Sequence, residues 1–297
     1  MVVIVWQSFR SDRKLPLAPS TQALPAYASR SKSARIADSE AALAGRLKAA
    51  KEISTDLTNG ELKSLIDFLT KPIDERNRES DLLAINEVMN SLRVTGIACG
   101  EYATALCRLI RDPNVHPVVR DYAIQHAIQW MRDANNGSFP AVMASEDRRR
   151  LLDCMVSFLH EPASLHETGY GTALNVLRTL ESTYPEDAAA IFEQCAPRIM
   201  EVAAGSESAP LANRVSAIQT LPALPDREAA LTLVRGMVAE VPIGSPVRLV
   251  AIATLGEIGE QSDLTTLKQL QTTDHRITYA ARAAFTRLEA SLLSSSR

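Results

Sequence analysis

Aromatic residues and glycine are both scarce in this sequence. Tryptophan, tyrosine and phenylalanine make up 5% of the 297 residues and glycine occurs 12 times, although 46% of the residues are hydrophobic. Alanine, leucine, valine and isoleucine must therefore supply most of the buried surface, which suits closely packed helices better than a β-sandwich. Few glycines also mean few turns that need a positive φ angle. The composition favours helices joined by short loops.

A general basic excess is missing as well. The net charge of the chain is −3, but residues 1–37 hold six basic side chains and a single acidic one, a local charge of +5. The rest of the chain therefore carries −8. Proteins that bind a phosphate backbone usually present a basic footprint. The acidic body argues against nucleic acid as the partner.

The sequence has no apolar run long enough to cross a membrane at its start. The run Met1–Trp6 (MVVIVW) is far shorter than the roughly 18 to 20 apolar residues that a span needs, and no basic region precedes it. Because Arg10, Arg13 and Lys14 follow, it resembles the end of a transmembrane helix and its basic flank. Residues 1–37 are expected to be a disordered tail, since three prolines prevent a long helix.

Two interpretations of this tail lead to different locations for the protein. The apolar run could be the remnant of a membrane anchor or signal whose true start lies upstream of Met1, in which case the protein is membrane-tethered or exported. It could instead be a simple apolar tag, and the chain as written would then be cytoplasmic.

The four cysteines show no pairing pattern. They are spread over separate segments with no CxxC spacing: Cys99, Cys107, Cys154 and Cys195. Isolated cysteines behave as small apolar residues of a core. We expect that role for all four, with a disulfide or metal role as the alternative.

Helical periodicity begins near residue 38 and continues almost to the end. Thr58 and Glu61 have the spacing of a capping box, which marks the start of a helix with one apolar face. Similar patterns follow one another without an alternating strand pattern. The folded body is therefore predicted to cover residues 38–293, with residues 294–297 as a disordered C-terminus.

Internal repetition is the most informative feature of the body. Three segments share the pattern Arg-x-x-Ala-Ile, beginning at Arg120, Arg214 and Arg248, and each follows a turn that contains proline. Weaker copies place further alanines in the same register. The full set is Ala84, Ala123, Ala173, Ala217, Ala251 and Ala281. An alanine at this position lets helix backbones approach, while the apolar residues that follow fill a shared core. Six helix pairs are predicted.

These segments resemble the HEAT repeat family, in which the second helix of a pair reads roughly Val-Arg-x-x-Ala-x-x-x-Leu. The best match runs from Pro246-Val247-Arg248 to Leu255. The resemblance implies an all-α fold, a right-handed superhelix of about six helix pairs that binds other molecules. Two departures are that Ala173 has no arginine before it and that Thr278 stands where the last repeat should have one.

The repeated arginines are the first candidate site residues. Arg120, Arg214 and Arg248 could line the inner surface and bind an acidic partner. Alternatively, each could form a structural ladder by making salt bridges or by capping a neighbouring turn.

Two further patterns suggest ligands only weakly. The pairs His160-Glu161 and His166-Glu167 contain metal-binding residue types, but not at the HExxH spacing. The segment Gly169-Tyr170-Gly171 precedes a predicted helix and could offer amides to an anion. It lacks the lysine and hydroxyl residue of a phosphate loop.

No nucleophile and base, metal set or cofactor motif stands out in the sequence. We therefore expect no catalytic, cofactor-binding or metal-binding residues and no cofactor. The leading hypothesis is a non-enzymatic scaffold or adaptor for a protein partner. The alternative is a HEAT-like enzyme or accessory protein that acts on nucleic acid or on a tetrapyrrole-bearing protein, similar to a DNA glycosylase or a bilin lyase.

Overall fold

The computed structural model describes residues 31–97, 99–136, 143–205 and 209–295. Within these ranges the chain forms fourteen α-helices and no strand. The helices are α2 (Lys32–Ala37), α3 (Leu43–Lys51), α4 (Asn59–Leu69), α5 (Arg78–Val94), α6 (Gly100–Arg111), α7 (Pro117–Asn136), α8 (Ser145–His160), α9 (Thr168–Glu181), α10 (Pro185–Ala204), α11 (Leu211–Thr220), α12 (Arg227–Glu240), α13 (Pro246–Ile258), α14 (Asp263–Thr273) and α15 (His275–Ser295). Two short 3-10 helices, η1 (Ala163–His166) and η2 (Leu221–Ala223), lie between them.

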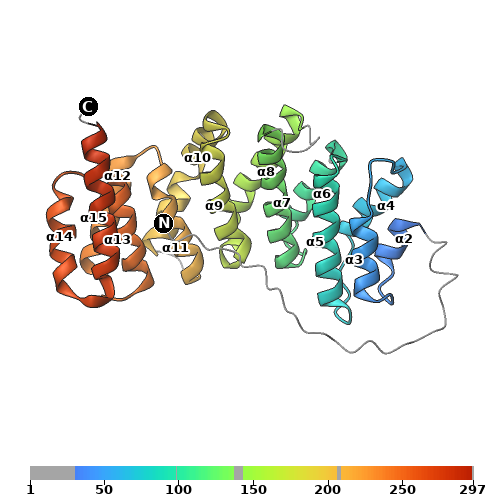
Figure 1. The fold of residues 1–297 in the computed structure, drawn as a ribbon, viewed down its shortest axis with the longest axis horizontal. Coiled ribbons are helices and arrows are strands. Elements are labelled where there is room, and N and C mark those ends of the chain that lie inside the picture. The colour runs from blue at the N-terminus through green and yellow to red at the C-terminus, as the bar shows by residue number, and fades with distance from the viewer. Residues whose placement is uncertain (1–30, 98, 137–142, 206–208, 296–297) are drawn as a thin grey trace.

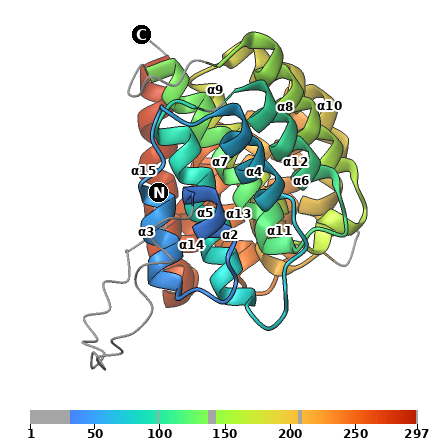
Figure 2. The ribbon, with the colours of Figure 1, turned by 90° about the vertical axis from the view of Figure 1, so that its right-hand side faces the viewer.

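The helices are arranged as antiparallel pairs that follow one another along one long axis, from α2 at one end to α15 at the other (Figure 1). The odd-numbered helices form one row, in which each member from α3 to α15 packs on the next. The even-numbered helices form a second row, visible beside the first in the end-on view of Figure 2. The expected all-α solenoid is therefore confirmed.

The solenoid bends in its C-terminal half. There α9, α11, α13 and α15 stay packed on one another, whereas α10, α12 and α14 have little or no contact among themselves. A row whose members remain in contact while the other row spreads apart lies on the inside of the bend. The odd-numbered row is thus the concave side.

Local sequence signals explain several helix ends. The Thr58 hydroxyl accepts a hydrogen bond from the backbone amide of Glu61, and the Glu61 carboxylate accepts one from the amide of Thr58, so the predicted capping box is present at α4. At the C-terminus of α10 the C-cap residue is Gly205, with a φ angle of 78°. A residue with a side chain would be strained in this left-handed conformation.

The alanines of the repeat register lie in the core. All six are fully buried, and each lies on an odd-numbered helix. The register read from the sequence therefore marks the second helix of each pair, as predicted.

The structure contains one more helix pair than predicted. Residues 32–37, which the sequence predicts to be part of a disordered tail, form α2, and the Ile36 side chain is completely buried against the next helices. The pair α2 and α3 brings the number of pairs in the described chain to seven. Its second helix holds Arg46 and Ala49, a further copy of the Arg-x-x-Ala pattern, and the buried Ile53 follows just after the helix ends.

At the other end, α15 continues to Ser295, two residues past the predicted boundary at residue 293. Residues 1–30, with the apolar run and most of the basic tail, lie outside the described residues. None of the helices in the described chain is long and apolar enough to cross a membrane.

Candidate binding groove

The repeated arginines connect the two helices of a pair. Arg120 on α7 is completely buried, and its Nε and Nη2 donate to the carbonyl oxygen of Ile110 at distances of 3.1 and 2.8 Å. Ile110 lies in the last turn of α6, where backbone carbonyls have no partner inside the helix. A cation there also interacts favourably with the helix dipole.

The same guanidinium binds the following pair. It donates to Glu161 at 2.7 Å and to Glu167, and it lies 4.8 Å from the ring centre of Phe158. Burial raises the pKa of Glu167 above its usual value, and the charge of Arg120 opposes that rise. One arginine thus joins α6, α7 and the turn between α8 and α9.

Arg46 has the same role at the N-terminal end. It is fully buried, and its Nε donates to the carbonyl oxygen of Ile36 at 2.8 Å, ten residues earlier, as Arg120 does to Ile110. Its Nη2 donates to Asp81 at 2.7 Å, on the following pair. The sequence signal for Arg46 was available, since Ala49 follows it at the repeat spacing.

The two C-terminal arginines have fewer partners. Arg214 donates to the carbonyl oxygens of Ala203 and Ala204, both at 3.0 Å, at the end of α10. Arg248 donates to Val241 at 2.9 Å, just after α12. Thr278 replaces the arginine in the last pair.

The Thr278 hydroxyl lies 3.1 Å from the carbonyl oxygen of Gln271, seven residues earlier in the sequence. Arg248 and Val241 are separated by the same number of residues. The structure thus places Arg120, Arg214 and Arg248 each at the joint of its own helix pair, where the arginines bind backbone carbonyls.

A groove of about 540 Å³ lies elsewhere, on the concave side of the C-terminal half. Four helices of the odd-numbered row line it: α9, α11, α13 and α15. Small and aliphatic side chains form its floor, namely Leu249, Val250, Ala253, Ala280, Ala283 and Ala284. The scarcity of large side chains on these helices leaves the groove open.

A row of three charges runs along the groove. Arg178 on α9 donates to Glu257 on α13 at 3.1 Å, and Arg287 on α15 lies 3.5 Å from the other oxygen of the same carboxylate. The exposed fractions of the three side chains lie between 33% and 44%. Two arginines therefore share one glutamate, and the row has a net charge of +1.

Two amide side chains accompany this row. Asn175 and Gln219 both line the groove, and neither side-chain amide makes a hydrogen bond within the described part of the chain. An amide can both donate and accept, so these groups suit the backbone of a bound peptide. None of the groove residues was among the predicted site residues, because they come from four separate helices.

The two weaker ligand patterns have structural roles. Glu161 and Glu167 bind Arg120, and the Nδ1 atom of His160 lies 2.9 Å from the carbonyl oxygen of Val156. Among the described residues no three histidine, cysteine or carboxylate side chains gather as they would around a metal. The segment Gly169-Tyr170-Gly171 is buried within α9, where a Cβ atom on Gly169 would contact neighbouring side chains.

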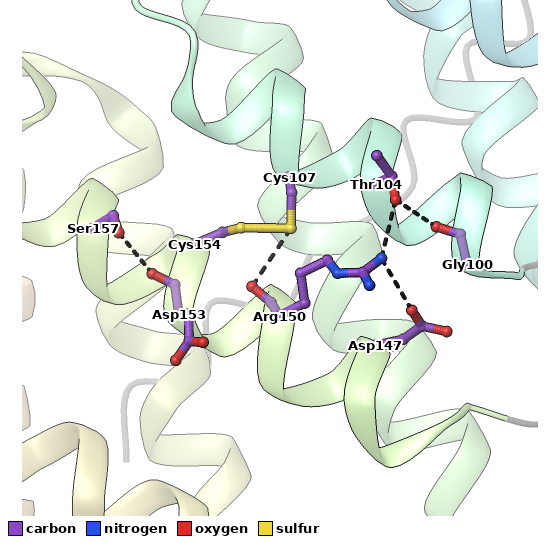
Figure 3. The surroundings of a disulfide bond; sticks show 8 residues. All are labelled: Gly100, Thr104, Cys107, Asp147, Arg150, Asp153, Cys154 and Ser157. Atoms are coloured by element: carbon purple, nitrogen blue, oxygen red, sulfur yellow. Dashed lines mark hydrogen bonds and ion pairs between the residues drawn. A yellow bond between two sulfur atoms is a disulfide. The ribbon is translucent and has the colours of Figure 1, made fainter.

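Cysteine behaves differently from the expectation at two positions. Cys107 on α6 and Cys154 on α8 form a disulfide, with a Cα–Cα distance of 5.7 Å (Figure 3). The Cys107 sulfur also lies 3.5 Å from the carbonyl oxygen of Arg150. The remaining two, Cys99 and Cys195, are free, and Cys195 is buried in the core as predicted.

Together these features define the class of the protein as an all-α helical repeat solenoid with a lined concave groove. No family model matches the sequence, and no curated protein matches it. Among solved structures, the chain is similar to a designed armadillo repeat protein, with 17% sequence identity and a TM-score of 0.44. That match covers 76% of this chain and 99% of the designed protein.

Proposed function

We propose that this protein is a non-enzymatic interaction scaffold built from HEAT-like repeats. In this proposal the groove on α9, α11, α13 and α15 holds an extended segment of a partner protein. The HEAT-like assignment is supported by the arginines that join the two helices of a pair. Thr278 departs from the pattern in the last pair, although its hydroxyl donates to a backbone carbonyl as those arginines do.

The charge row carries the proposal. Arg178 and Arg287 share the single carboxylate of Glu257, so one positive charge in the groove is not neutralised by it. The apolar floor lies beside it. A segment with one aspartate or glutamate next to apolar side chains would complement both features, because charge-assisted hydrogen bonds are about twice as strong as neutral ones.

Nucleic acid suits this groove less well. Binding a phosphate backbone takes several basic side chains in a row, and the groove has two that share an acid. The enzyme alternative, whether it acts on nucleic acid or on a tetrapyrrole-bearing protein, gains no support from the geometry.

Selection from a displayed library of random peptides, with the full chain as bait, tests the proposal. We expect enriched peptides to carry an acidic residue flanked by apolar ones. Their affinities would then be measured by fluorescence anisotropy with the wild type and with Arg178→Gln, Arg287→Gln and Ala253→Trp. Arg149→Gln, at an exposed position on α8, is the matched control.

Each groove variant should weaken binding by about tenfold or more, since a hydrogen bond to a charged group contributes about 1.5–3 kcal/mol. The tryptophan should act by filling the floor. Arg149→Gln should bind as the wild type does. Enrichment of no peptide, or of peptides whose affinity the groove variants leave unchanged, would refute the proposal.

A further inference from the structure

The outer face of α15 exposes large apolar side chains at the end of the solenoid. Tyr279 is 81% exposed and Leu293 is 63% exposed, although both lie on a helix whose other side is packed into the core. Only four large hydrophobic side chains in the described chain are exposed, and these are two of them. An apolar strip at a solenoid end is unusual, because terminal repeats normally carry a polar outer face.

Helical geometry places these side chains on one strip. Successive residues of a helix are about 100° apart, so residues seven and fourteen positions apart lie nearly above one another. Tyr279, Thr286 and Leu293 have this spacing, and the exposed Ala290 lies beside them. The buried residues of α15 lie on the opposite side: Ile277, Ala281, Ala284 and Leu288. The strip therefore faces away from α13.

Charges flank this strip in a specific way. α15 contains three arginines after its first residue, and two of them are paired within the chain: Arg276 with Asp274 at 2.8 Å, and Arg287 with Glu257. The third, Arg282, has no ion pair within the described part of the chain.

Glu289 has none there either. It lies seven residues after Arg282, and hence on the same flank of the strip. Two unmatched opposite charges thus stand on one flank of an exposed apolar strip.

We propose that α15 is a homodimer interface, in which it packs antiparallel against α15 of a second copy about a two-fold axis at Thr286. A two-fold axis pairs each residue with the one equally far on the other side of Thr286. Tyr279 then lies opposite Leu293 of the second copy, and Arg282 lies close to Glu289 of the second copy. Symmetry repeats both contacts.

Self-complementarity favours a second copy over an unrelated partner. Both large apolar residues lie at the ends of the strip, and small side chains occupy its middle, so two such helices can approach closely at the crossing. In an antiparallel pair the same flank of each helix faces the other, which brings the two unmatched charges of one copy against those of the other. An unrelated partner would need its own apolar strip with one acidic and one basic side chain at the matching positions.

The size of the contact predicts a moderate affinity. A helix of 21 residues is about 31 Å long, so a contact between one face of each of two such helices falls at the small end of the range of interface areas, below about 1,200 Å². We therefore expect dissociation constants on the order of micromolar rather than nanomolar. Dimer formation should be visible at tens to hundreds of micromolar protein.

Sedimentation equilibrium of the full chain between about 5 and 300 µM tests this interface. The wild type should dimerise, and Tyr279→Lys should be monomeric across the range. Arg282→Glu and Glu289→Arg should each weaken association about tenfold, because each reversal replaces two attractive pairs with two repulsive ones. The double variant Arg282→Glu/Glu289→Arg should regain the wild-type affinity. Arg149→Glu, exposed on α8, is the control and should dimerise normally.

All of these side chains are exposed, so the variants should fold, and far-UV circular dichroism checks that they do. A wild type that stays monomeric at 300 µM overturns the proposal. The proposal is also overturned if Tyr279→Lys still dimerises, or if Arg282→Glu/Glu289→Arg dimerises no more tightly than either single variant, because the interface then lies elsewhere. Peptide binding in the groove is measured separately, and neither result determines the other.

Discussion

Replacing Gly256 with alanine tests the closest helix contact in the solenoid. A Cβ atom on Gly256 of α13 would lie 2.5 Å from the Cα, 2.7 Å from the Cβ and 2.8 Å from the carbonyl oxygen of Ala284 on α15. Carbon atoms in contact are normally 3.5–4.0 Å apart. Because the obstacle is mainly backbone, no side-chain rotation relieves the clash, and the two helices would have to separate by about 1 Å.

Two effects of opposite sign set the size of the change. Extra carbon in a well-packed core costs about 1–3 kcal/mol, and a clash with backbone places this site near the upper end. Alanine also favours the helix over glycine by about 1 kcal/mol. We therefore expect Gly256→Ala to lower the free energy of unfolding by about 2 kcal/mol, which corresponds to a fall in Tm of roughly 4–8 °C for a chain of this size.

Gly236 on α12 provides the matched control. It is also a glycine inside a helix, but a Cβ atom there would meet nothing within 4 Å. Gly236→Ala should therefore raise stability by about 1 kcal/mol, the propensity gain alone. The two substitutions are chemically identical, so the difference of about 3 kcal/mol isolates the packing of α13 on α15.

Urea unfolding followed by far-UV circular dichroism measures both variants. Repeat proteins can lose their terminal repeats before the rest, so amide hydrogen exchange in α13, α14 and α15 should accompany it. Exchange in these helices should become faster in Gly256→Ala. If Gly256→Ala is as stable as the wild type or more stable, α13 and α15 do not approach each other closely at Gly256.

Three further outcomes are expected. Reduction of the Cys107–Cys154 disulfide, whose residues are 47 positions apart, should lower the free energy of unfolding by up to about 4 kcal/mol. The stability of a variant with alanine at both positions should not change when reductant is added. If reductant changes the stability of the wild type and of this variant equally, the disulfide is not the cause. In urea unfolding, Arg120→Met should lower the free energy of unfolding by about 3–5 kcal/mol, because Glu161 and Glu167 lose their ion-pair partner. Arg248→Met should lower it by only about 1 kcal/mol, because a single hydrogen bond to a carbonyl is lost. Equal losses in the two variants would show that the ion pairs with the glutamates do not contribute. Burial lowers the pKa of His126 from its usual 6.5 to about 4, so the unfolded chain takes up a proton at a higher pH than the folded chain does. The stability present above pH 6.5 should therefore fall by up to about 3 kcal/mol as the pH drops to 4. In His126→Gln the free energy of unfolding should depend less steeply on pH over this range, and an unchanged dependence would show that His126 is not the cause.

The helices and their register could be predicted from local patterns. An apolar face at three- and four-residue spacing needs only neighbouring residues, and the capping box at Thr58 and Glu61 lies within one turn. The buried alanines of the repeat share a position relative to their own helix, so a single sequence shows them. The first helix of the N-terminal pair is not predicted, because α2 has only six residues, too few for a clear periodicity, and forms the end of the basic stretch 1–37.

Arginine roles were only partly predictable. The pattern Arg-x-x-Ala-Ile places Arg120 and Arg248 identically in the sequence, yet one binds two glutamates of the next pair and the other a single carbonyl. The difference depends on which residues the following turn brings into reach. That turn belongs to another repeat, at separations of more than forty residues for Arg120.

Local sequence patterns are enough to show that this chain is a stack of helix pairs, which residues face the core and where most pairs begin. These properties depend on residues within about one helical turn of each other. The contacts between different pairs follow only from the folded arrangement. Folding pairs Cys107 with Cys154, brings Arg178 within reach of Glu257 across 79 residues, and leaves the outer face of α15 uncovered. Such contacts depend on how far each pair is rotated against the next, and small rotations add up along a solenoid.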